Sequence, residues 1–536
     1  MAYIHPYPTP SPSPPDHDTL SSGNYPLVVV ASTRTVVSGT VIPATIAISP
    51  VTGKIISVIS AVLPRNAFAT GTQYTDYSPH LLLPGIVDAH VHLNEPGRTE
   101  WEGFYTGTRA AASGGVTTVI DMPLNAIPPT TTINGLGEKV AAAQGKCWVD
   151  VGFYGGIVPG NAHELRPLVA AGVRGFKGFL IDSGVAEFPA VSSTDILKVM
   201  AELADEPTTL MFHAEMIPPI TDSVGDDVQW SLPPLAPIGP LNEYRTFLAS
   251  RPTSFEEYAI SQVISLAANA PDLPLHIVHL SAIEAIPMLR EARAAGVKIT
   301  AETCFHYLSL AAENIEHGDT RHKCCPPIRT QMNQDGLWEE LLSGEDSVIK
   351  TVVSDHSPCT PELKLLPHSL RAHANREGLP QTPPSEDEQL AKEERKAGDF
   401  FSAWGGVSSV GLGLPILWTS AFENHRDISP VNVAKWCCED TAKQVGLDHC
   451  KGKLEVGYDG DICVFDDTAE WIVGAEGEGM LFRNKVTAYQ GKKMRGAVRE
   501  TWLRGRKIWD RAAVTTSDGF GGMKPGGRLL LEPRKS

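Results

Sequence analysis

Eight short apolar segments recur along the chain from His80 onward, and an amphipathic segment follows most of them. An apolar run of strand length followed by a segment with helical spacing is typical of a βα unit in a parallel sheet. Eight such units close into a barrel, so the sequence predicts an α/β fold of the (β/α)8 TIM barrel class. The predicted strands are LLLPGIVDAHVHL, VTTVIDMP, WVDVGFYGG, VRGFKGFL, TTLMFHAE, LPLHIVHLS, VKITAETC and IKTVVSDHS.

Short β-rich runs broken by Gly and Pro lie on both sides of these repeats, at residues 25–82 and 456–515. We expect the two flanking segments to form one small β-sandwich domain, which would hold both ends of the barrel segment 83–455. Residues 1–24 are rich in Pro and Ser and cannot offset the entropy of ordering, so they are predicted to be a disordered tail. Residues 516–536 are a C-terminal tail.

Two long irregular insertions interrupt the repeats, at about residues 216–252 and 359–398. Both follow the carboxyl ends of predicted barrel strands, which is where this fold keeps its active sites. The insertions are therefore predicted to cover the site as lids, and unrelated mobile loops are the alternative.

The chain has 45 basic and 62 acidic residues and a net charge of −17, which disfavours nucleic acid and anionic membranes as partners. Neither a secretion signal nor an apolar run of about 18 residues is found, so a cytoplasmic location is expected. The nine cysteines do not resemble the disulfide framework of a small secreted protein, so reduced thiols are expected.

Candidate metal ligands stand at the ends of the predicted strands. His90 and His92 are two residues apart in DAHVHL, so their side chains face the same way on a strand. His213, His279 and Asp355 each end a different predicted strand, and a barrel aims all of those ends at one cavity. Singly, each has a structural alternative, a hydrogen-bonded core histidine or an aspartate that caps a helix. Together, four histidines and one aspartate indicate a metal site.

Lys177 in VRGFKGFL is the other unusual residue, because an unpaired ammonium at the end of an apolar strand is costly to bury. A lysine that reaches solvent or forms an ion pair is the ordinary explanation. Beside two metal ions, a carbamylated lysine is the alternative. Carbon dioxide added to a neutral amine gives a carboxylate able to bridge both ions, which requires a lysine of lowered pKa.

Seven motifs, in this order, resemble those of the cyclic amidohydrolases, the family that contains dihydroorotases, hydantoinases and allantoinases. They are DAHVHL, GFKGFL, FHAE, HIVHLS, ETCFHYL, CCPPIR and SDHSPCTPELK, and the resemblance covers roughly residues 25–510. It implies two divalent ions, zinc most often, with iron, cobalt or manganese possible. It also implies a homotetramer.

The resemblance assigns a role to each candidate ligand. His90, His92 and Asp355 would hold the more buried ion, His213 and His279 the other, and carbamylated Lys177 would bridge the two. The ions would activate a shared hydroxide for attack on a ring amide carbonyl. Asp355 would then pass the proton to the departing nitrogen and so serve as the catalytic acid and base.

Residues after the histidine pair bear on the choice of ring. Dihydroorotases resemble HxHxR here, with an arginine that grips the substrate carboxylate, whereas this chain has Asn94. An amide suits a neutral ureide rich in donors and acceptors. The runs NEPGRTEWEG and MPLNAIPPTT resemble the allantoinase branch, which implies allantoin as the small-molecule substrate. Asn94 and Asn125 are the candidate substrate contacts, and asparagines in surface turns are the alternative.

Two rival functions stay open at this point. One is a dihydroorotase or a hydantoinase (dihydropyrimidinase), and Asn94 counts against the first. The other is a non-catalytic relative that uses the barrel as an assembly scaffold. Such proteins tend to lose metal ligands, which this chain keeps. One departure from the family pattern is Phe305 in ETCFHYL, where relatives usually carry proline, and it puts in doubt the shape of the loop after the seventh strand.

Overall fold

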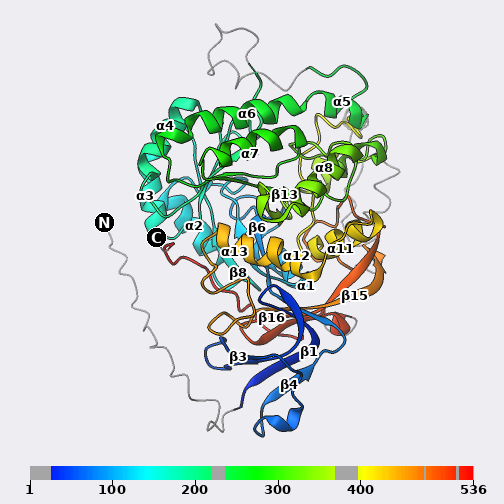
Figure 1. Ribbon diagram of the computed structural model, residues 1–536. Helices are drawn as coiled ribbons and strands as arrows, with labels where there is room; N and C mark the ends of the chain where they lie inside the picture. The colour runs from blue at the N-terminus through cyan, green and yellow to red at the C-terminus, as the bar shows by residue number, and fades with distance from the viewer. Residues whose placement is uncertain (1–25, 219–235, 368–395, 476–477, 515–517, 535–536) are drawn as a thin grey trace.

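The computed structural model describes residues 26–218, 236–367, 396–475, 478–514 and 518–534. The predicted tail at residues 1–24 lies outside this range. A barrel surrounded by helices forms the larger part of the molecule, and a small β domain lies at one end of it (Figure 1).

Eight strands of the barrel coincide with the eight predicted apolar segments, and neighbouring strands pair in parallel. They form two hydrogen-bonded groups, one of three strands and one of five that also includes the short strand β9 (Gly155–Gly156). The barrel strands are β6 (Ile86–Val91), β7 (Val116–Asp121), β8 (Asp150–Phe153), β10 (Phe176–Phe179), β11 (Leu210–His213), β12 (Leu275–Ile277), β13 (Ile299–Cys304) and β14 (Ile349–Val353).

The first and last strands meet at a seam that closes the barrel. Val91 and His356 form a parallel bridge, and the His92 amide donates to the His356 carbonyl at 2.8 Å. Nearby, the Asp88 carboxylate accepts from the Ser354 amide at 3.1 Å. At the other junction only Tyr154 separates β8 from β9, which pairs with β10. The predicted (β/α)8 fold is therefore confirmed.

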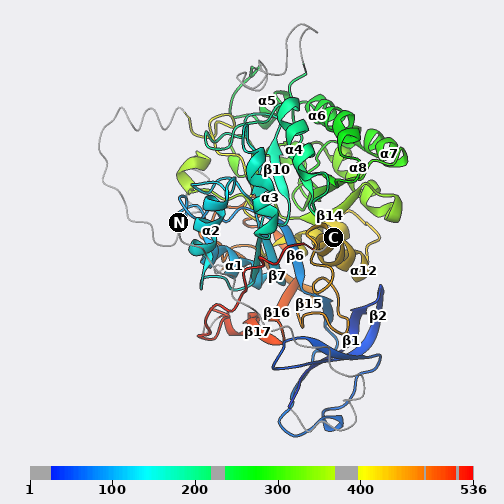
Figure 2. The same ribbon diagram turned by 90° about the vertical axis from the view of Figure 1, so that its left-hand side faces the viewer.

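Helices cover the outside of the barrel (Figures 1 and 2). Several begin at side-chain caps that satisfy free backbone amides, as at α4, where Ser192 and Asp195 form a capping box. No helix in the described residues is both long enough and apolar enough to cross a membrane. The helices are α1 (Phe104–Ser113), α2 (Ile133–Ala143), α3 (Ala162–Ala170), α4 (Ser193–Leu203), α5 (Tyr244–Ala249), α6 (Thr253–Leu266), α7 (Ile286–Ala294), α8 (Gln331–Leu342), α11 (Gly413–Glu423), α12 (Pro430–Ala434) and α13 (Asp440–Gln444).

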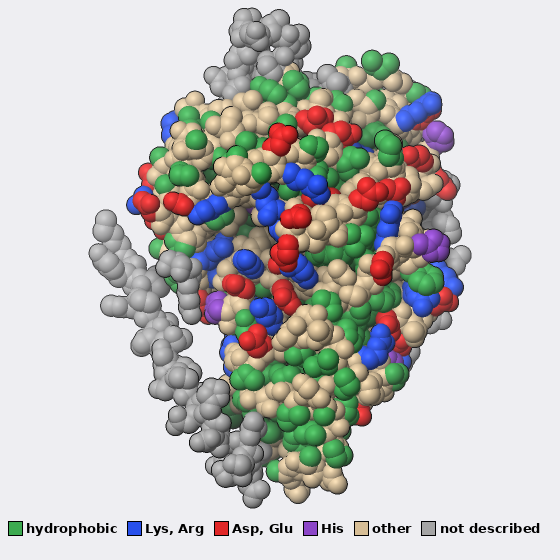
Figure 3. All heavy atoms as spheres, viewed as in Figure 1, with side chains coloured by type: hydrophobic (Ala, Val, Ile, Leu, Met, Phe, Trp, Pro, Cys, Tyr) green, Lys and Arg blue, Asp and Glu red, His purple; other side chains and the backbone are tan. Residues whose placement is uncertain are grey.

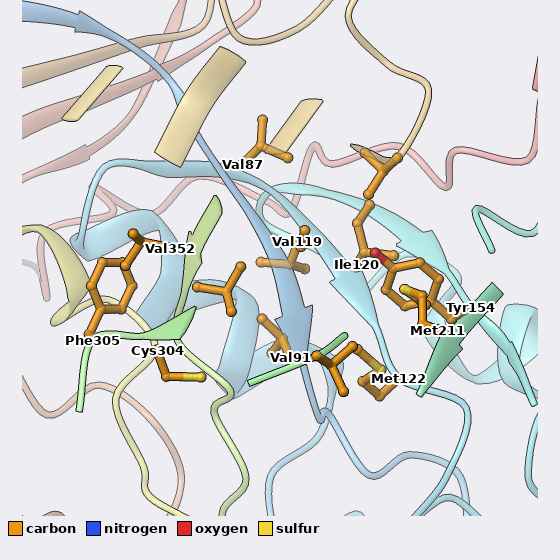
Figure 4. Packing of buried hydrophobic residues seen from close by; sticks show 14 of the residues in the cluster. Val87, Val91, Val119, Ile120, Met122, Tyr154, Met211, Cys304, Phe305 and Val352 are labelled. Carbon is orange, nitrogen blue, oxygen red and sulfur yellow. The ribbon is translucent and has the colours of Figure 1, made fainter. Parts of the chain in front are cut away.

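The barrel interior is packed with side chains and is not a pore. In Figure 4 the side chains of Ile120, Tyr154 and Met211 lie together, and all three are at most 1% exposed. Close packing of this kind fixes the strand ends relative to one another, which positions the groups above them.

The two flanking segments meet in one sheet of eight strands. Its order is β17-β16-β15-β5-β1-β2-β3, with β4 paired to β1. The halves join where β5 pairs antiparallel with β15, with Leu83 opposite Cys463. A separate apolar cluster draws residues from both halves, among them Ile46 and Trp502. The strands are β1 (Val28–Val37), β2 (Thr40–Ile48), β3 (Ile55–Ile59), β4 (Gln73–Asp76), β5 (Leu81–Pro84), β15 (Ile462–Ile472), β16 (Lys493–Leu503) and β17 (Arg506–Asp510).

The C-terminal segment returns to the barrel. Leu529 bridges Val151 of β8 in parallel, and the Val151 amide donates to the Arg528 carbonyl at 2.8 Å. In Figure 2 this segment, drawn in dark red, runs from the region of β17 along the barrel to the C-terminus. The sequence alone predicted only a tail for these residues.

All nine cysteines are free, as expected from the sequence.

Surface charge is mixed on the face shown in Figure 3. Acidic and basic side chains are intermixed over the barrel there, so this face carries no patch of one sign.

Phe305, which the sequence analysis singled out as a departure from the family pattern, is 4% exposed. Its ring lies against the first residue of α11, Gly413. A Cβ added there would stand 2.2 Å from Phe305 Cε2. The aromatic ring therefore takes the space that a larger residue at position 413 would need.

We expect Gly413→Ala to destabilise the protein by about 1–3 kcal/mol, because the ring is buried and cannot move aside. Gly137→Ala is the matched control. Gly137 is exposed inside α2 and has open space around it, so alanine there stabilises by about 0.5–1 kcal/mol. Urea unfolding of the two variants measures both effects. Equal stability of Gly413→Ala and wild type would contradict the close packing.

Candidate active site

All six side chains expected to hold metal lie at or near the carboxyl ends of barrel strands, and none is more than 7% exposed. They are His90 in β6, His92 just after it, Lys177 in β10, His213 at the end of β11, His279 after β12 and Asp355 after β14.

The first group joins both ends of the barrel. Asp355 Oδ1 lies 3.1 Å from His90 Nε2 and 3.4 Å from His92 Nε2. One ligand atom from each of the three residues lies within 4.8 Å of the others. The seam between β6 and β14 brings these residues together, since Asp355 directly precedes His356 in that seam.

The second group lies beside the first. His213 Nδ1 is 3.1 Å from His279 Nε2, and the ring centroids of His90 and His279 are 5.5 Å apart. Lys177 Nζ lies 3.2 Å from His90 Nε2, so the lysine is adjacent to the first group. The structure thus brings all six predicted residues to one place.

Three residues that hold the histidines in position were missed by the sequence analysis. Glu302 Oε1 lies 2.5 Å from His90 Nδ1, and Glu215 Oε2 lies 2.8 Å from His213 Nε2. Arg251 Nη1 in turn donates to Glu215 Oε2 at 2.6 Å. These contacts leave His90 Nε2 and His213 Nδ1 to face the centre of the site. The sequence did offer an indication for Glu302 and Glu215. Each lies in a predicted strand segment, VKITAETC and TTLMFHAE, and a carboxylate buried in a strand requires a partner.

Burial lowers the pKa of three of the four imidazoles, those of His92, His213 and His279. The pKa of His92 falls to about 3 and that of His279 well below its usual value. Burial and Lys177 also act to lower the pKa of His90, but Asp355 and Glu302 outweigh them and raise it. Burial acts to raise the pKa of Asp355, but His90 and His92 outweigh it and hold that pKa well below its usual range. Neutral imidazole lone pairs beside an ionised carboxylate are the donor set that zinc and similar ions prefer.

Two of the site residues have strained backbones. His279 has φ of 40° and Asp355 has φ of 42°, both in the left-handed region that such residues rarely adopt. Each such residue costs on the order of 1–3 kcal/mol, which the surrounding packing must offset. Both side chains contact another predicted ligand, His279 contacting His213 and Asp355 contacting His90.

A cavity of about 510 Å³ opens above the site. Its walls come from the loops that follow the barrel strands, and five of the six predicted ligands, all except His90, line it. The described lining residues include His92, Asn125, Lys177, Phe179, Asp182, Ser183, His213, Phe247, Arg251, His279, Lys323, Cys324, Cys325, Asp355, Trp404 and Gly406.

The two predicted substrate contacts lie in different places. Asn125 lines the cavity, and its Nδ2 lies 3.3 Å from His92 Nδ1. Asn94 is 1% exposed and is not among the described lining residues, and its Nδ2 donates to the Pro358 carbonyl at 3.3 Å. The geometry therefore favours Asn125 over Asn94 as a residue that meets a ligand.

The predicted lids can be followed only at their ends. Residues 219–235 and 368–395, the middle of each insertion, lie outside the described residues. Phe247 and Arg251 from the first insertion line the cavity, as does Leu363 from the second. The ends of both insertions thus reach the site, and the closing of a lid stays a prediction.

His306 lies behind Asp355 and is 1% exposed. Burial lowers its pKa from 6.5 to about 4. Between about pH 6.5 and about pH 4, His306 is therefore protonated in the unfolded chain but neutral in the folded chain. Protonation then favours the unfolded chain, so His306 lowers the free energy of unfolding as the pH falls through this range. We expect His306→Leu to remove a pH-dependent loss of about 2 kcal/mol between about pH 7 and about pH 5.

Urea unfolding midpoints of wild type and variant at both pH values measure this effect. His163→Gln is the control, because the His163 side chain is 77% exposed. The other buried histidines contribute equally to wild type and variant, so the difference reports on His306. An unchanged pH dependence in His306→Leu would contradict the assignment.

The sequence matches the amidohydrolase family over residues 81–224 and 252–508. It is 45% identical over 516 residues to an allantoinase of Saccharomyces cerevisiae, and the alignment covers 95% of this chain and 100% of the yeast protein. It is 41% identical over 504 residues to an allantoinase of Streptomyces avermitilis, covering 94% of this chain and 98% of that protein.

Among solved structures, the L-hydantoinase (dihydropyrimidinase) of Arthrobacter aurescens superposes with a TM-score of 0.74. It is 24% identical and covers 94% of this chain and 99% of its own, so it supports the fold. A family match over most of the chain, together with relatives above 40% identity along nearly all of it, establishes that this chain belongs to the amidohydrolase family.

Proposed function

We propose that this protein hydrolyses a ring amide bond of allantoin and releases allantoate. The observation that carries the proposal is the 45% identity to a yeast allantoinase along that protein's entire length. The site adds support, because four histidines, a lysine and an aspartate of the family pattern lie together, and all of them except His90 line the cavity.

The donor set fits two divalent ions. His90, His92 and Asp355 would hold one and His213 and His279 the other. His279 Nδ1 is buried without a hydrogen-bond partner among the described residues, and its Nε2 faces His213 across 3.1 Å. A separation of 3.1 Å suits a hydrogen bond between these two nitrogens, and two ligands of one cation lie at a similar distance. Bound ions would lower the pKa of a shared water and polarise the ring carbonyl.

Lys177 is suited to the carbamate bridge. Burial lowers its pKa to about 8, so a fraction of the amine is neutral near neutral pH. A neutral amine adds carbon dioxide to give a carbamate and releases one proton. The resulting negative charge would replace an ammonium that otherwise faces the imidazole of His90. Zinc is the proposed metal, and nitrogen and carboxylate ligands also accept iron, cobalt or manganese.

We infer that Asp355 moves the proton. It is ionised because its pKa is held well below the usual range, and its Oδ1 lies at the base of the cavity. In the proposed reaction, water adds its oxygen to the ring carbonyl carbon and the C–N bond breaks. Asp355 takes the proton of the attacking water and gives it to the departing nitrogen, so one carboxylate serves as base and then acid.

The charges around the cavity favour a neutral ring over dihydroorotate. Besides Lys177, the described lining cations are Arg251 and Lys323. Arg251 is paired with Glu215, whose pKa Arg251 and His213 hold at about 2 although burial acts to raise it. Lys323 Nζ donates to the Phe401 and Ala403 carbonyls. Both cations are thus engaged, and a substrate carboxylate would need a free one.

The first test is release of ureido acid from allantoin, hydantoin, dihydrouracil and dihydroorotate, with metal content measured on the same sample. We expect turnover of allantoin to exceed that of the other rings by at least about 100-fold, since a site built for polar contacts rejects rings that lack them. Preferred turnover of another ring would retain the reaction and replace the substrate. No turnover by metal-loaded protein would favour a scaffold.

Glu302 gives a separate test of the metal site. It contacts His90 Nδ1 and also lies 3.2 Å from His276 Nε2, and these histidines lower its pKa to about 2 although burial acts to raise it. We expect Glu302→Gln to weaken metal retention about 10–100-fold, because the carboxylate orients the ligand and raises its basicity.

Metal retained after dialysis against a graded chelator series measures this change. Glu340→Gln is the matched control, because Glu340 is also buried but binds Arg290 and the Val348 amide away from the cavity. Equal retention by Glu302→Gln and Glu340→Gln would remove Glu302 from the metal site.

A homotetramer and a cytoplasmic location complete the proposal. Light scattering after size-exclusion chromatography measures the first, and a monomer would contradict it. The compartment needs direct localisation, because a related allantoinase of Aquarana catesbeiana, 42% identical over 428 residues, is described as mitochondrial.

A further inference from the structure

A second pocket, of about 260 Å³, lies at the opposite end of the barrel from the metal ligands. Its walls come from the turn between β2 and β3, from the β16–β17 hairpin, from Trp148 just before β8, and from the C-terminal segment. Its lining residues thus come from the small domain, the barrel and the returning C-terminal segment. Figure 2 shows these three parts of the chain next to one another.

The pocket is strongly basic in a chain of net charge −17. Arg504, Arg506, Lys524 and Arg528 line it, and the described lining residues include no acidic side chain. Clustered cations repel one another, so a paired carboxylate or a bound anion would stabilise the cluster.

Among the described residues, only one of the four cations has a carboxylate partner. Arg504 Nη1 contacts the buried carboxylate of Asp150, which also accepts from Lys451 Nζ at 2.6 Å. Lys451 further binds Asp461 at 2.7 Å, and Lys54 binds Asp459 at 2.8 Å. Three carboxylates thus balance Arg504, Lys451 and Lys54, with none left for the pocket.

The remaining three cations are exposed and unpaired. In the part of the chain that the structure describes, Arg506, Lys524 and Arg528 make no side-chain ion pair. Lys524 lies within a glycine-rich stretch, GFGGMKPGG at 519–527, and Arg528 directly follows it. Gly526 of this stretch lines the pocket together with Gly53. Small residues of this kind let an anion approach the backbone closely.

We propose that this pocket binds a phosphate-type oxyanion, either free or as part of a larger phosphate ester. Three cations around one open pocket match the charge and the several acceptor oxygens of a phosphate group. Arg506 belongs to the small domain, and Lys524 and Arg528 belong to the segment that pairs with β8 through Leu529. A bound anion would therefore tie the C-terminal segment to the small domain and stabilise the junction.

The test uses the full chain with inorganic phosphate, pyrophosphate and ATP as probes, measured by titration calorimetry and thermal unfolding. Sodium chloride at matched ionic strength controls for screening. We expect the Tm to rise with at least one phosphate probe and not with chloride. The probe that binds distinguishes a free anion from a phosphate ester, and either result supports the site.

The triple variant Arg506→Gln, Lys524→Gln, Arg528→Gln should bind that probe at least about tenfold more weakly. It should fold, because the three side chains are exposed and unpaired. Arg65→Gln, at an exposed arginine elsewhere, should bind as wild type. Unreduced binding by the triple variant would overturn the proposal, since the anion would then occupy another place such as the metal centre. Absence of binding by every probe would overturn it equally.

Discussion

The seam between the first and last barrel strands is the contact on which the rest of the structure depends. The His92 amide donates to the His356 carbonyl, and the Ser354 amide donates to the Asp88 carboxylate. These bonds join residues more than 260 positions apart in the chain. The same seam that closes the barrel also brings Asp355 to His90 and His92, so formation of the fold and assembly of the site are one event.

Several of the buried ionisable groups at the site are stabilised by a partner. Glu302 holds His90, and the pair of Glu215 and Arg251 holds His213. A carboxylate buried without such a partner would shift its pKa upward and become neutral. The partners also fix which ring nitrogen faces the cavity, which decides where a cation can bind.

The sequence was sufficient for the fold and for the residues at the strand ends, because both follow from local periodicity. Spacing of two along a strand puts His90 and His92 on one face, and eight repeats leave few other folds. The difference between Asn94 and Asn125 could not be predicted. Both have positive φ, at 61° and 67°, and only the packing of distant loops decides which one reaches the cavity.

The return of the C-terminal segment to the barrel could not be predicted from the sequence either, for a related reason. Residues 519–527 have the composition of a linker, and their place is set by the bridge between Leu529 and Val151 that local propensity does not reveal.

Positive charge is balanced differently at the two ends of the barrel. At the metal ligands, Arg251 and Lys323 are engaged by protein groups, which leaves a cavity suited to a neutral ring. At the opposite end, the pocket is lined by three cations without a carboxylate partner among the described residues, Arg506, Lys524 and Arg528. An anion from solution is the simplest group that can balance their charge.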